Sequence, residues 1–304
     1  MSIAFARSWR PRVLRRVTIL GTGLIGGSIA QGLRAAGGWT LHGVDTAASA
    51  RTAAEASGVF HALTMPETLG PEDVIVLAMP TAAAAAVLPT LAPALAAGAT
   101  VTDVASVKGP LAEALGALPP ALQRQVVLGH PIAGSERSGM AASDGALFQG
   151  RRVVLTPFGD TAPEALGKVE QIWSALGAEI ETLSVEVHDA VLARTSHLPH
   201  LLAFALVDAL GADPHREAIF RLLAGGFRDF TRIAGSDPTM WSQIFTTNGP
   251  ALLEALDRFE ATLRTFRGAI AAEDGAALFE AIARARATRD AALAESFGDA
   301  HDAP

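Results

Sequence analysis

The chain has 304 residues, half of them hydrophobic, with a formal net charge of −7 and no cysteine. This acidic balance argues against a nucleic-acid protein, because such proteins carry a clustered basic excess. The lack of cysteine excludes disulfides and a thiol nucleophile. No secretory signal pattern and no uninterrupted apolar stretch of about 18 residues is visible in the sequence. We therefore expect a cytoplasmic protein of two domains that binds neither nucleic acid nor membrane.

The first 16 residues are basic and contain no acidic residue. We interpret them as a flexible tail, with a targeting peptide or a contact to an anion as the alternatives. Residues 298–304 are expected to form a second tail. The arginines of the first segment are Arg7, Arg10, Arg12, Arg15 and Arg16.

Residues 17–185 alternate between strand-like and helix-like runs, which is the pattern of an α/β domain with a doubly wound parallel sheet. The predicted strands are 17–20, 40–45, 74–79, 100–104, 126–128, 152–156 and 179–183. The predicted helices are 23–36, 47–57 and 82–97, with a further helix that ends near Leu176.

Strand signals stop near residue 186, and residues 186–297 predict an all-α second domain. Its expected helices are 186–211, 214–224, 239–247, 250–268 and 275–296, with breaks at Pro214, Gly225-Gly226 and Gly249-Pro250. The segments 200–210 and 252–270 are hydrophobic around more of their circumference than one core face requires. We therefore expect a homodimer that forms through the helical domain.

The segment Gly21-Thr22-Gly23-Leu24-Ile25-Gly26 follows a predicted strand and opens a predicted helix. In that context G-x-G-x-x-G predicts a Rossmann-type dinucleotide site, with the pyrophosphate at the helix N-terminus. Asp45 ends the next strand, where a carboxylate accepts the ribose hydroxyls and repels a 2′-phosphate. The nearest basic residue, Arg51, is a full turn into the next helix. The sequence thus predicts NAD rather than NADP, and Asp45 could also cap that helix.

A polar segment, residues 129–136, follows the apolar run 126–128 and contains His130. Ligands of open α/β sheets bind beyond the carboxyl ends of the strands, so we expect His130 in a turn-rich segment that faces a ligand. Gly134 permits a turn that would bring Ser135 or Glu136 toward the imidazole. An ordinary surface loop is the alternative.

Four segments stand out beside the glycine loop: 101–108, 129–136, 196–200 and 227–241. In this order they resemble the prephenate/arogenate dehydrogenase family of tyrosine biosynthesis, from about Val17 to Leu293. The resemblance implies NAD(P)⁺-dependent oxidative decarboxylation of a small molecule, either prephenate to 4-hydroxyphenylpyruvate or arogenate to tyrosine. The sequence does not distinguish these two substrates.

Removing hydride from a carbinol carbon requires a base for the hydroxyl proton, and neutral imidazole suits that task near pH 7. The resemblance places His130 at that position, with Ser106 orienting the hydroxyl and the imidazole. Ser106 is also a candidate for binding the cofactor. Ser106 could equally be the N-cap of a helix at 107–115. Arg232 is the candidate for binding a substrate carboxylate, because a guanidinium offers a forked donor. Arg228 is expected instead to pair with Asp229 or Asp237.

His197 and His200 lie near His188-Asp189, which raises the possibility of a metal site. We favour no metal, since two histidines without a firm third ligand are a poor site and hydride transfer needs none. The resemblance places both histidines beside the substrate, with His200 the better candidate for its carboxylates. A core role for His197 stays open.

Glu136 and Lys108 are further polar candidates in the cleft. Glu136 suits a gate or a partner for a substrate amine, and Lys108 a partner for a phosphate or for sheet-edge carbonyls.

Two other classes of protein remain as alternatives. A β-hydroxyacid dehydrogenase or imine reductase relies on a catalytic lysine in its second domain, but no lysine follows Lys168. A non-catalytic NAD-sensing protein would have no need of His130 together with Arg232.

Overall fold

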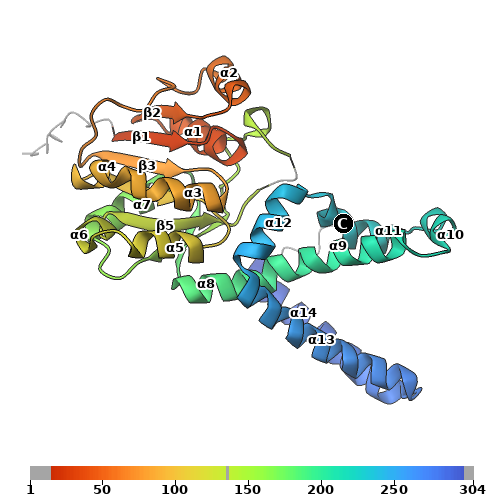
Figure 1. Ribbon diagram of the computed structural model, residues 1–304. Coiled ribbons are helices and arrows are strands. Elements are labelled where there is room, and N and C mark those ends of the chain that lie inside the picture. The colour runs from red at the N-terminus through yellow and green to blue at the C-terminus, as the bar shows by residue number, and fades with distance from the viewer. Residues whose placement is uncertain (1–14, 135–136, 298–304) are drawn as a thin grey trace, which may run out of the picture. The chain divides into compact units, whose positions relative to one another are not determined.

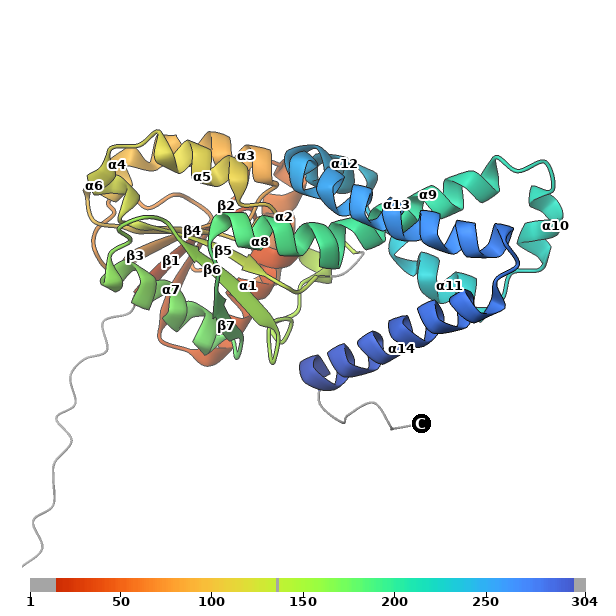
Figure 2. The same cartoon turned by 90° about the horizontal axis from the view of Figure 1, so that it is seen from below.

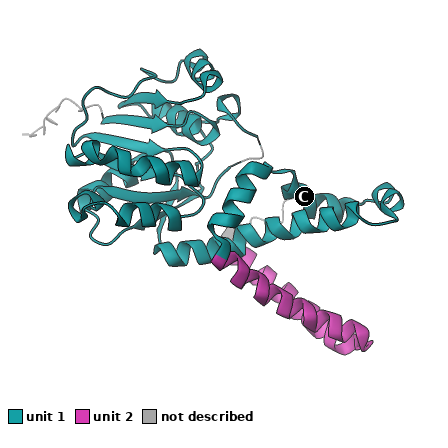
Figure 3. Ribbon diagram, viewed as in Figure 1, with its two compact units in different colours: residues 1–249 teal, residues 250–304 magenta. Residues whose placement is uncertain are grey.

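The computed structural model describes residues 15–134 and 137–297. It contains two compact units, Met1–Gly249 and Pro250–Pro304 (Figure 3). The larger unit holds the sheet and the helices that build the site. The domain limits 17–185 and 186–297 stay a prediction. Arg15 and Arg16, which the tail prediction included, lie in the first strand, and Arg16 forms a two-pronged salt bridge with Asp73, both contacts at 2.7 Å.

A seven-stranded sheet with the order β2-β1-β3-β4-β5-β6-β7 forms the centre of the larger unit (Figure 1). Its strands are β1 (Arg15–Leu20), β2 (Trp39–Val44), β3 (Asp73–Leu77), β4 (Thr100–Asp103), β5 (Val126–Pro131), β6 (Arg152–Pro157) and β7 (Glu179–Thr182). The chain leaves β1 toward β2 and returns to the other side of β1 as β3, which makes the end of β1 a topological switch point. The predicted α/β class is confirmed.

One strand departs from the predicted parallel sheet. β6 pairs antiparallel with β5, from Val127 opposite Pro157 to Pro131 opposite Val153, whereas every other strand pair is parallel. The sequence predicted β6 but not its direction. This pairing extends β5 past the apolar run 126–128 as far as Pro131.

Helices cover both faces of the sheet (Figure 2). The core of one face includes α1 (Leu24–Ala36) and α7 (Pro163–Ala175), where Trp173 packs edge-on against Phe148. The core of the other face includes α3 (Thr81–Val87), the 3₁₀ turn η1 (Leu88–Leu91), α4 (Ala92–Ala96) and α5 (Gly109–Gly116). The predicted single helix 82–97 is therefore three short ones. Pro89 and Pro93 lie at these breaks and cannot donate to the preceding turn.

The shorter elements of this part are α2 (Ala48–Ser57), α6 (Pro120–Gln123) and η2 (Met140–Ala142). A helical segment then completes the larger unit. It comprises α8 (Val185–Leu192), η3 (Ala193–His197), α9 (Leu198–Gly211), α10 (Arg216–Arg221), α11 (Gly225–Thr231), η4 (Arg232–Gly235) and α12 (Pro238–Thr247). The break predicted at Gly225-Gly226 lies just before these residues, at 222–224, and Gly225 begins α11. The smaller unit consists of α13 (Gly249–Ala271) and α14 (Gly275–Phe297). The first residue of α13, Gly249, still belongs to the larger unit.

The run Val185–Gly211 is continuous over 27 residues, and by length and composition alone it could cross a bilayer. The core helix of a globular protein passes the same test. Here the buried residues His188, Asp189 and His197 are polar and form hydrogen bonds with each other or with other elements of the unit. These contacts fix the first part of the run, up to His197, to the other elements of the unit.

Candidate active site

The glycine loop between β1 and α1 leaves no room for side chains at two of its positions. A Cβ atom on Gly21, where φ is 101°, would lie 2.2 Å from the Ala78 carbonyl oxygen, and one on Gly26 would lie 2.0 Å from the Gly21 oxygen. Gly23, the N-cap of α1, has open space around its Cβ position and offers no side-chain cap. The amide groups of the first turn, at Leu24 and Ile25, therefore border an open space that suits a diphosphate.

Asp45 is tied to this loop at the end of β2. Its Oδ2 accepts hydrogen bonds from the Thr22 amide at 2.8 Å and the Thr22 hydroxyl at 3.1 Å, and its Oδ1 accepts from the Ala47 amide at 3.0 Å. The N-cap of α2 is Ala47, so the alternative that Asp45 caps that helix was wrong. Arg51 donates to the carbonyl oxygens of Asp45 and Thr46 at 3.0 and 2.7 Å. The carboxylate is thus fixed beside the glycine loop.

A buried ion pair joins β4 to β5. Backbone pairing between these strands ends at Thr102 opposite Val127. Beyond this pair, side chains connect the two strands. Asp103 Oδ1 accepts from the Gly129 amide at 3.0 Å, while Lys108 Nζ donates to the Gly129 carbonyl at 2.6 Å and to Asp103 Oδ2. Both polar groups of Gly129, the residue before His130, are therefore held by charged side chains.

Lys108 is fully buried in this pair, and the suggestion that it faces the cleft toward a phosphate was wrong. The alternative that it binds carbonyl oxygen at the sheet edge is right. Burial lowers the pKa of Lys108, and the neighbouring carboxylate of Asp103 opposes that shift.

His130 lies within β5, opposite Val154 of β6, and not in a turn beyond the strand. The expectation of a turn-rich loop was wrong, because the antiparallel β6 holds residues 129–131 extended. The residue is 8% exposed, and its Nδ1 lies 2.9 Å from Nε2 of His188. The pKa of His130 is held well below its usual 6.5 by burial, and then by the nearby His188, Lys108 and His197.

Asp189 completes a line of three side chains. His188 Nδ1 lies 2.7 Å from Asp189 Oδ1, and the same carboxylate accepts from the backbone amides of Lys108 at 2.9 Å and Gly109 at 2.8 Å. Burial raises the pKa of Asp189, but these hydrogen bonds outweigh it and the net shift is downward. Asp189, from another element, thus binds the first amides of α5.

Ser106 is not the cap of that helix, because α5 begins at Gly109. Ser106 is half-buried in the loop between β4 and α5. The role of His188 in contacting His130 was missed at the sequence level. The available signal was an adjacent His-Asp pair inside an apolar helical run.

His197 is buried at the end of the π-helical turn η3. Its Nδ1 accepts from Asn248 Nδ2 at 3.1 Å, and Asn248 also donates to the Asp189 carbonyl at 2.9 Å. Burial lowers the pKa of His197 to about 4, with the charge of Asp189 opposing the shift. In an unbroken α-helix, residues nine positions apart such as His188 and His197 would lie about half a turn apart. The wider π turn changes this angle.

His200 stacks on Trp241, with ring centroids 3.6 Å apart, and its Nδ1 donates to the Ser196 carbonyl at 2.9 Å. Burial lowers the pKa of His200, the Ser196 carbonyl opposes this, and the positive charge of Arg232 lowers the pKa further. Arg232 is exposed at the start of η4. α9 and η4, which carry His200 and Arg232, contact each other.

Arg228 pairs with Asp229 at 3.6 Å, as the sequence predicted. Ser135 and Glu136 lie outside the described residues. Among residues 15–134 and 137–297, no three histidine or acidic side chains gather as a metal-binding group.

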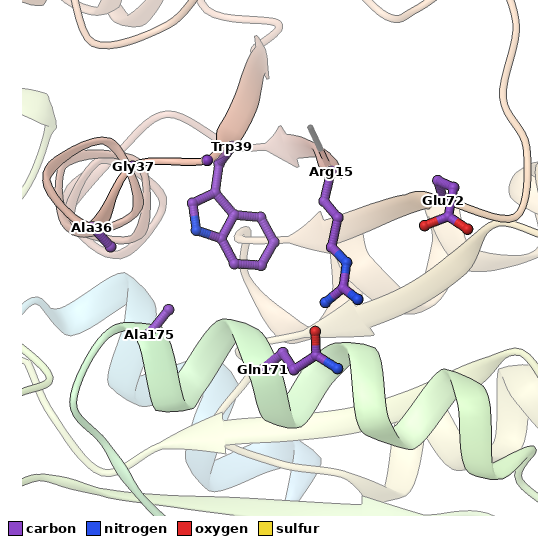
Figure 4. A pocket seen from close by; sticks show the side chains of 8 residues that line it. Arg15, Ala36, Gly37, Trp39, Glu72, Gln171 and Ala175 are labelled. Atoms are coloured by element: carbon purple, nitrogen blue, oxygen red, sulfur yellow. The ribbon is translucent and has the colours of Figure 1, made fainter. Parts of the chain in front are cut away.

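A pocket near Arg15, Trp39, Glu72 and Gln171 is separate from this site (Figure 4). Arg15 and Trp39 are the first residues of β1 and β2, whereas Gly21 and Asp45 follow the last residues of the same strands. The pocket therefore lies at the opposite edge of the sheet from the glycine loop.

The fold and the glycine loop define the class, a dinucleotide-binding α/β protein with a buried histidine on a central strand. Residues 29–182 match the family model of the prephenate dehydrogenase nucleotide-binding domain, and residues 184–284 match that of the prephenate dehydrogenase dimerization domain. The chain belongs to the prephenate dehydrogenase family.

Three relatives illustrate the similarity. A cyclohexadienyl dehydrogenase of Zymomonas mobilis is 36% identical over 273 residues, which are 88% of this chain and 92% of the relative. The crystal structure of the prephenate dehydrogenase of A. aeolicus, in complex with hydroxyphenyl propionate and NAD⁺, has a TM-score of 0.82 at 35% identity and covers 90% of this chain and 97% of that one. The Synechocystis arogenate dehydrogenase structure has a TM-score of 0.73 at 28% identity, with coverage of 90% and 99%.

The buried ion pair leads to a stability prediction. Lys108→Met leaves the Asp103 carboxylate buried without its cation, so we expect the free energy of unfolding to fall by about 3–5 kcal/mol. The control is Lys168→Met at the only other lysine, which donates to the Pro71 carbonyl at the surface; here we expect a loss of about 1 kcal/mol. Urea unfolding measures both. Equal, small losses would contradict a structural role for the pair.

Proposed function

We propose that this protein catalyses the NAD⁺-dependent oxidative decarboxylation of prephenate to 4-hydroxyphenylpyruvate, of arogenate to tyrosine, or of both. Family membership over most of the chain supports the reaction. The observation that carries it is His130, a buried imidazole on the strand next to β4, held through Nδ1. Within the described residues its Nε2 takes part in no hydrogen bond, which leaves that nitrogen for a substrate hydroxyl.

The reaction requires one base and balances without another reactant. The carbinol C–H bond breaks with transfer of hydride to the nicotinamide, the hydroxyl proton moves to His130 Nε2, and the C–CO₂⁻ bond breaks to release CO₂. The electron pair of that bond makes the ring aromatic, and the phenolate oxygen then takes the proton back. His130 is therefore unchanged at the end of each turnover, and Ser106 is proposed to orient the hydroxyl.

The residues around the glycine loop fit NAD. The uncapped first turn of α1 would hold the diphosphate, and Asp45 the ribose hydroxyls. When bound, NAD⁺ supplies the hydride acceptor. Asp45 disfavours NADP through repulsion of its 2′-phosphate, and the Arg51 guanidinium is already engaged with two carbonyl oxygens. We therefore propose NAD as the preferred cofactor.

The proton-accepting role of His130 agrees with its surroundings. Because burial holds its pKa well below 6.5, the imidazole is neutral and able to accept a proton at pH 7. The lowered pKa makes the imidazole a weaker base. It also keeps the imidazole unprotonated at mildly acidic pH, so we expect the activity to extend into that range.

Arg232 and His200 are proposed to bind the substrate carboxylates, Arg232 through its forked guanidinium. His197 is proposed to pack beneath this site, because it is buried and bound to Asn248. A contact of Glu136 with the amine of arogenate stays a prediction, as does a cytoplasmic location.

A homodimer is proposed through the helical part of the chain. The match of residues 184–284 to a dimerization domain supports it. So do large apolar side chains exposed on α13 and α14, where a single copy would leave them in water. They are Leu253, Leu263, Ile270, Phe279 and Ile282. Light scattering at micromolar concentration should give the mass of two chains, and the mass of one would contradict the dimer.

Steady-state kinetics test the proposed reaction directly. NADH formation is measured with prephenate and with arogenate, each with NAD⁺ and with NADP⁺. We expect turnover of at least one substrate and a higher kcat/KM with NAD⁺. No NADH with either substrate would restore the two alternatives, a β-hydroxyacid dehydrogenase or imine reductase and a non-catalytic NAD-binding protein.

Two variants separate the base from the substrate contact. His130→Asn should lower kcat by about 10²–10⁴-fold and remove the loss of activity in acid, which arises when the base is protonated below its pKa. Arg232→Lys should mainly raise KM, because lysine cannot reproduce the forked contact. An acidic limb that persists in His130→Asn would point to a different base.

A further inference from the structure

We propose that His188 and Asp189 are positioning residues that set the tautomer of His130, so that its Nδ1 carries the proton and its Nε2 is free to act as the base. The inference rests on the proposed function, since it concerns the residue that accepts the substrate proton. It assigns a task to two residues that the proposed reaction does not otherwise use.

The direction of each hydrogen bond follows from the chemistry of its acceptor. An ionised carboxylate only accepts, so His188 Nδ1 must donate to Asp189 Oδ1 across 2.7 Å. A neutral His188 then has an unprotonated Nε2, which accepts from Nδ1 of His130 across 2.9 Å. A neutral His130 that donates through Nδ1 has its lone pair on Nε2. One charged group thus determines the tautomers of two rings.

Asp189 is suited to this role because its orientation is fixed independently of His188. The amides of Lys108 and Gly109 donate to its two carboxylate oxygens, and Asn248 donates to its backbone carbonyl. These hydrogen bonds also keep the carboxylate ionised, in agreement with its lowered pKa. His188 itself is fully buried, so water does not compete for either of its ring nitrogens.

The same line of residues offsets the charge that forms during the reaction. When His130 accepts a proton, the three groups together change from a net charge of −1 to zero, which is less costly in a buried site than an isolated imidazolium. Lys108 is a further charged group near His130, and Asp103 already neutralises it. The nearby His197 is neutral at pH 7, because its pKa is about 4.

Three variants test the proposal. Asp189→Asn keeps the shape of the side chain, but its amide group can donate to His188 Nδ1 and reverse both tautomers. His188→Leu removes the acceptor for His130 Nδ1, and His188→Gln restores an amide oxygen as acceptor. The matched control is His215→Leu, at an exposed histidine before α10. For each variant kcat and KM are measured with the preferred substrate, together with the thermal unfolding midpoint.

We expect kcat of Asp189→Asn to fall by about 10³–10⁴-fold, as the wrong tautomer does in a serine-protease triad. For His188→Leu we expect a loss of about 10²-fold or more in kcat. KM should change little in both, His188→Gln should recover part of the lost kcat, and His215→Leu should behave as wild type.

Wild-type kcat in a folded Asp189→Asn would overturn the proposal, and so would equal kcat values for His188→Leu and His188→Gln. If His188→Leu fails to fold, Asp189→Asn against wild type decides the matter alone. Failure of the proposed function has a separate signature. His130→Asn would then keep its activity, or the wild-type protein would oxidise neither substrate.

Discussion

The carboxylate of Asp189 is the contact on which the rest of the site depends. It joins the first amides of α5 to the helical segment that begins with α8, and it fixes His188 from the same position. α5 follows β4 in the sheet, so this single group connects the nucleotide-binding edge to the helices. A negative charge at a helix N-terminus interacts favourably with the helix dipole and accepts hydrogen bonds from the unpaired amides.

A second buried charge acts on the other side of His130. The Asp103–Lys108 pair holds both polar groups of Gly129 and so fixes the backbone that carries the histidine. The Asp103–Lys108 pair thus fixes the backbone next to His130, and His188 of α8 fixes the His130 ring. A base held at both points loses little freedom when the substrate binds, which is the usual requirement for efficient proton transfer.

Local sequence patterns were sufficient for the strands, for most helices and for the glycine loop, because each depends on neighbouring residues. They failed where a distant partner decides the outcome. The sequence predicts a turn-rich segment at residues 129–131, but these residues pair with β6 and form part of a strand. Ser106 was a candidate helix cap at the sequence level. The group that binds the amides at the start of α5 is instead Asp189, which is 80 residues from Gly109. No periodicity could indicate the link from His130 to His188.

The most direct test of the proposed active site is to determine which ring nitrogen of His130 carries the proton. Nitrogen NMR of the protein labelled at its histidines, with the signal assigned by comparison with His130→Asn, distinguishes a protonated ring nitrogen from a bare one. At pH 7 we expect a protonated Nδ1 and an unprotonated Nε2 on His130. The reverse assignment, or a doubly protonated ring at that pH, would contradict this expectation.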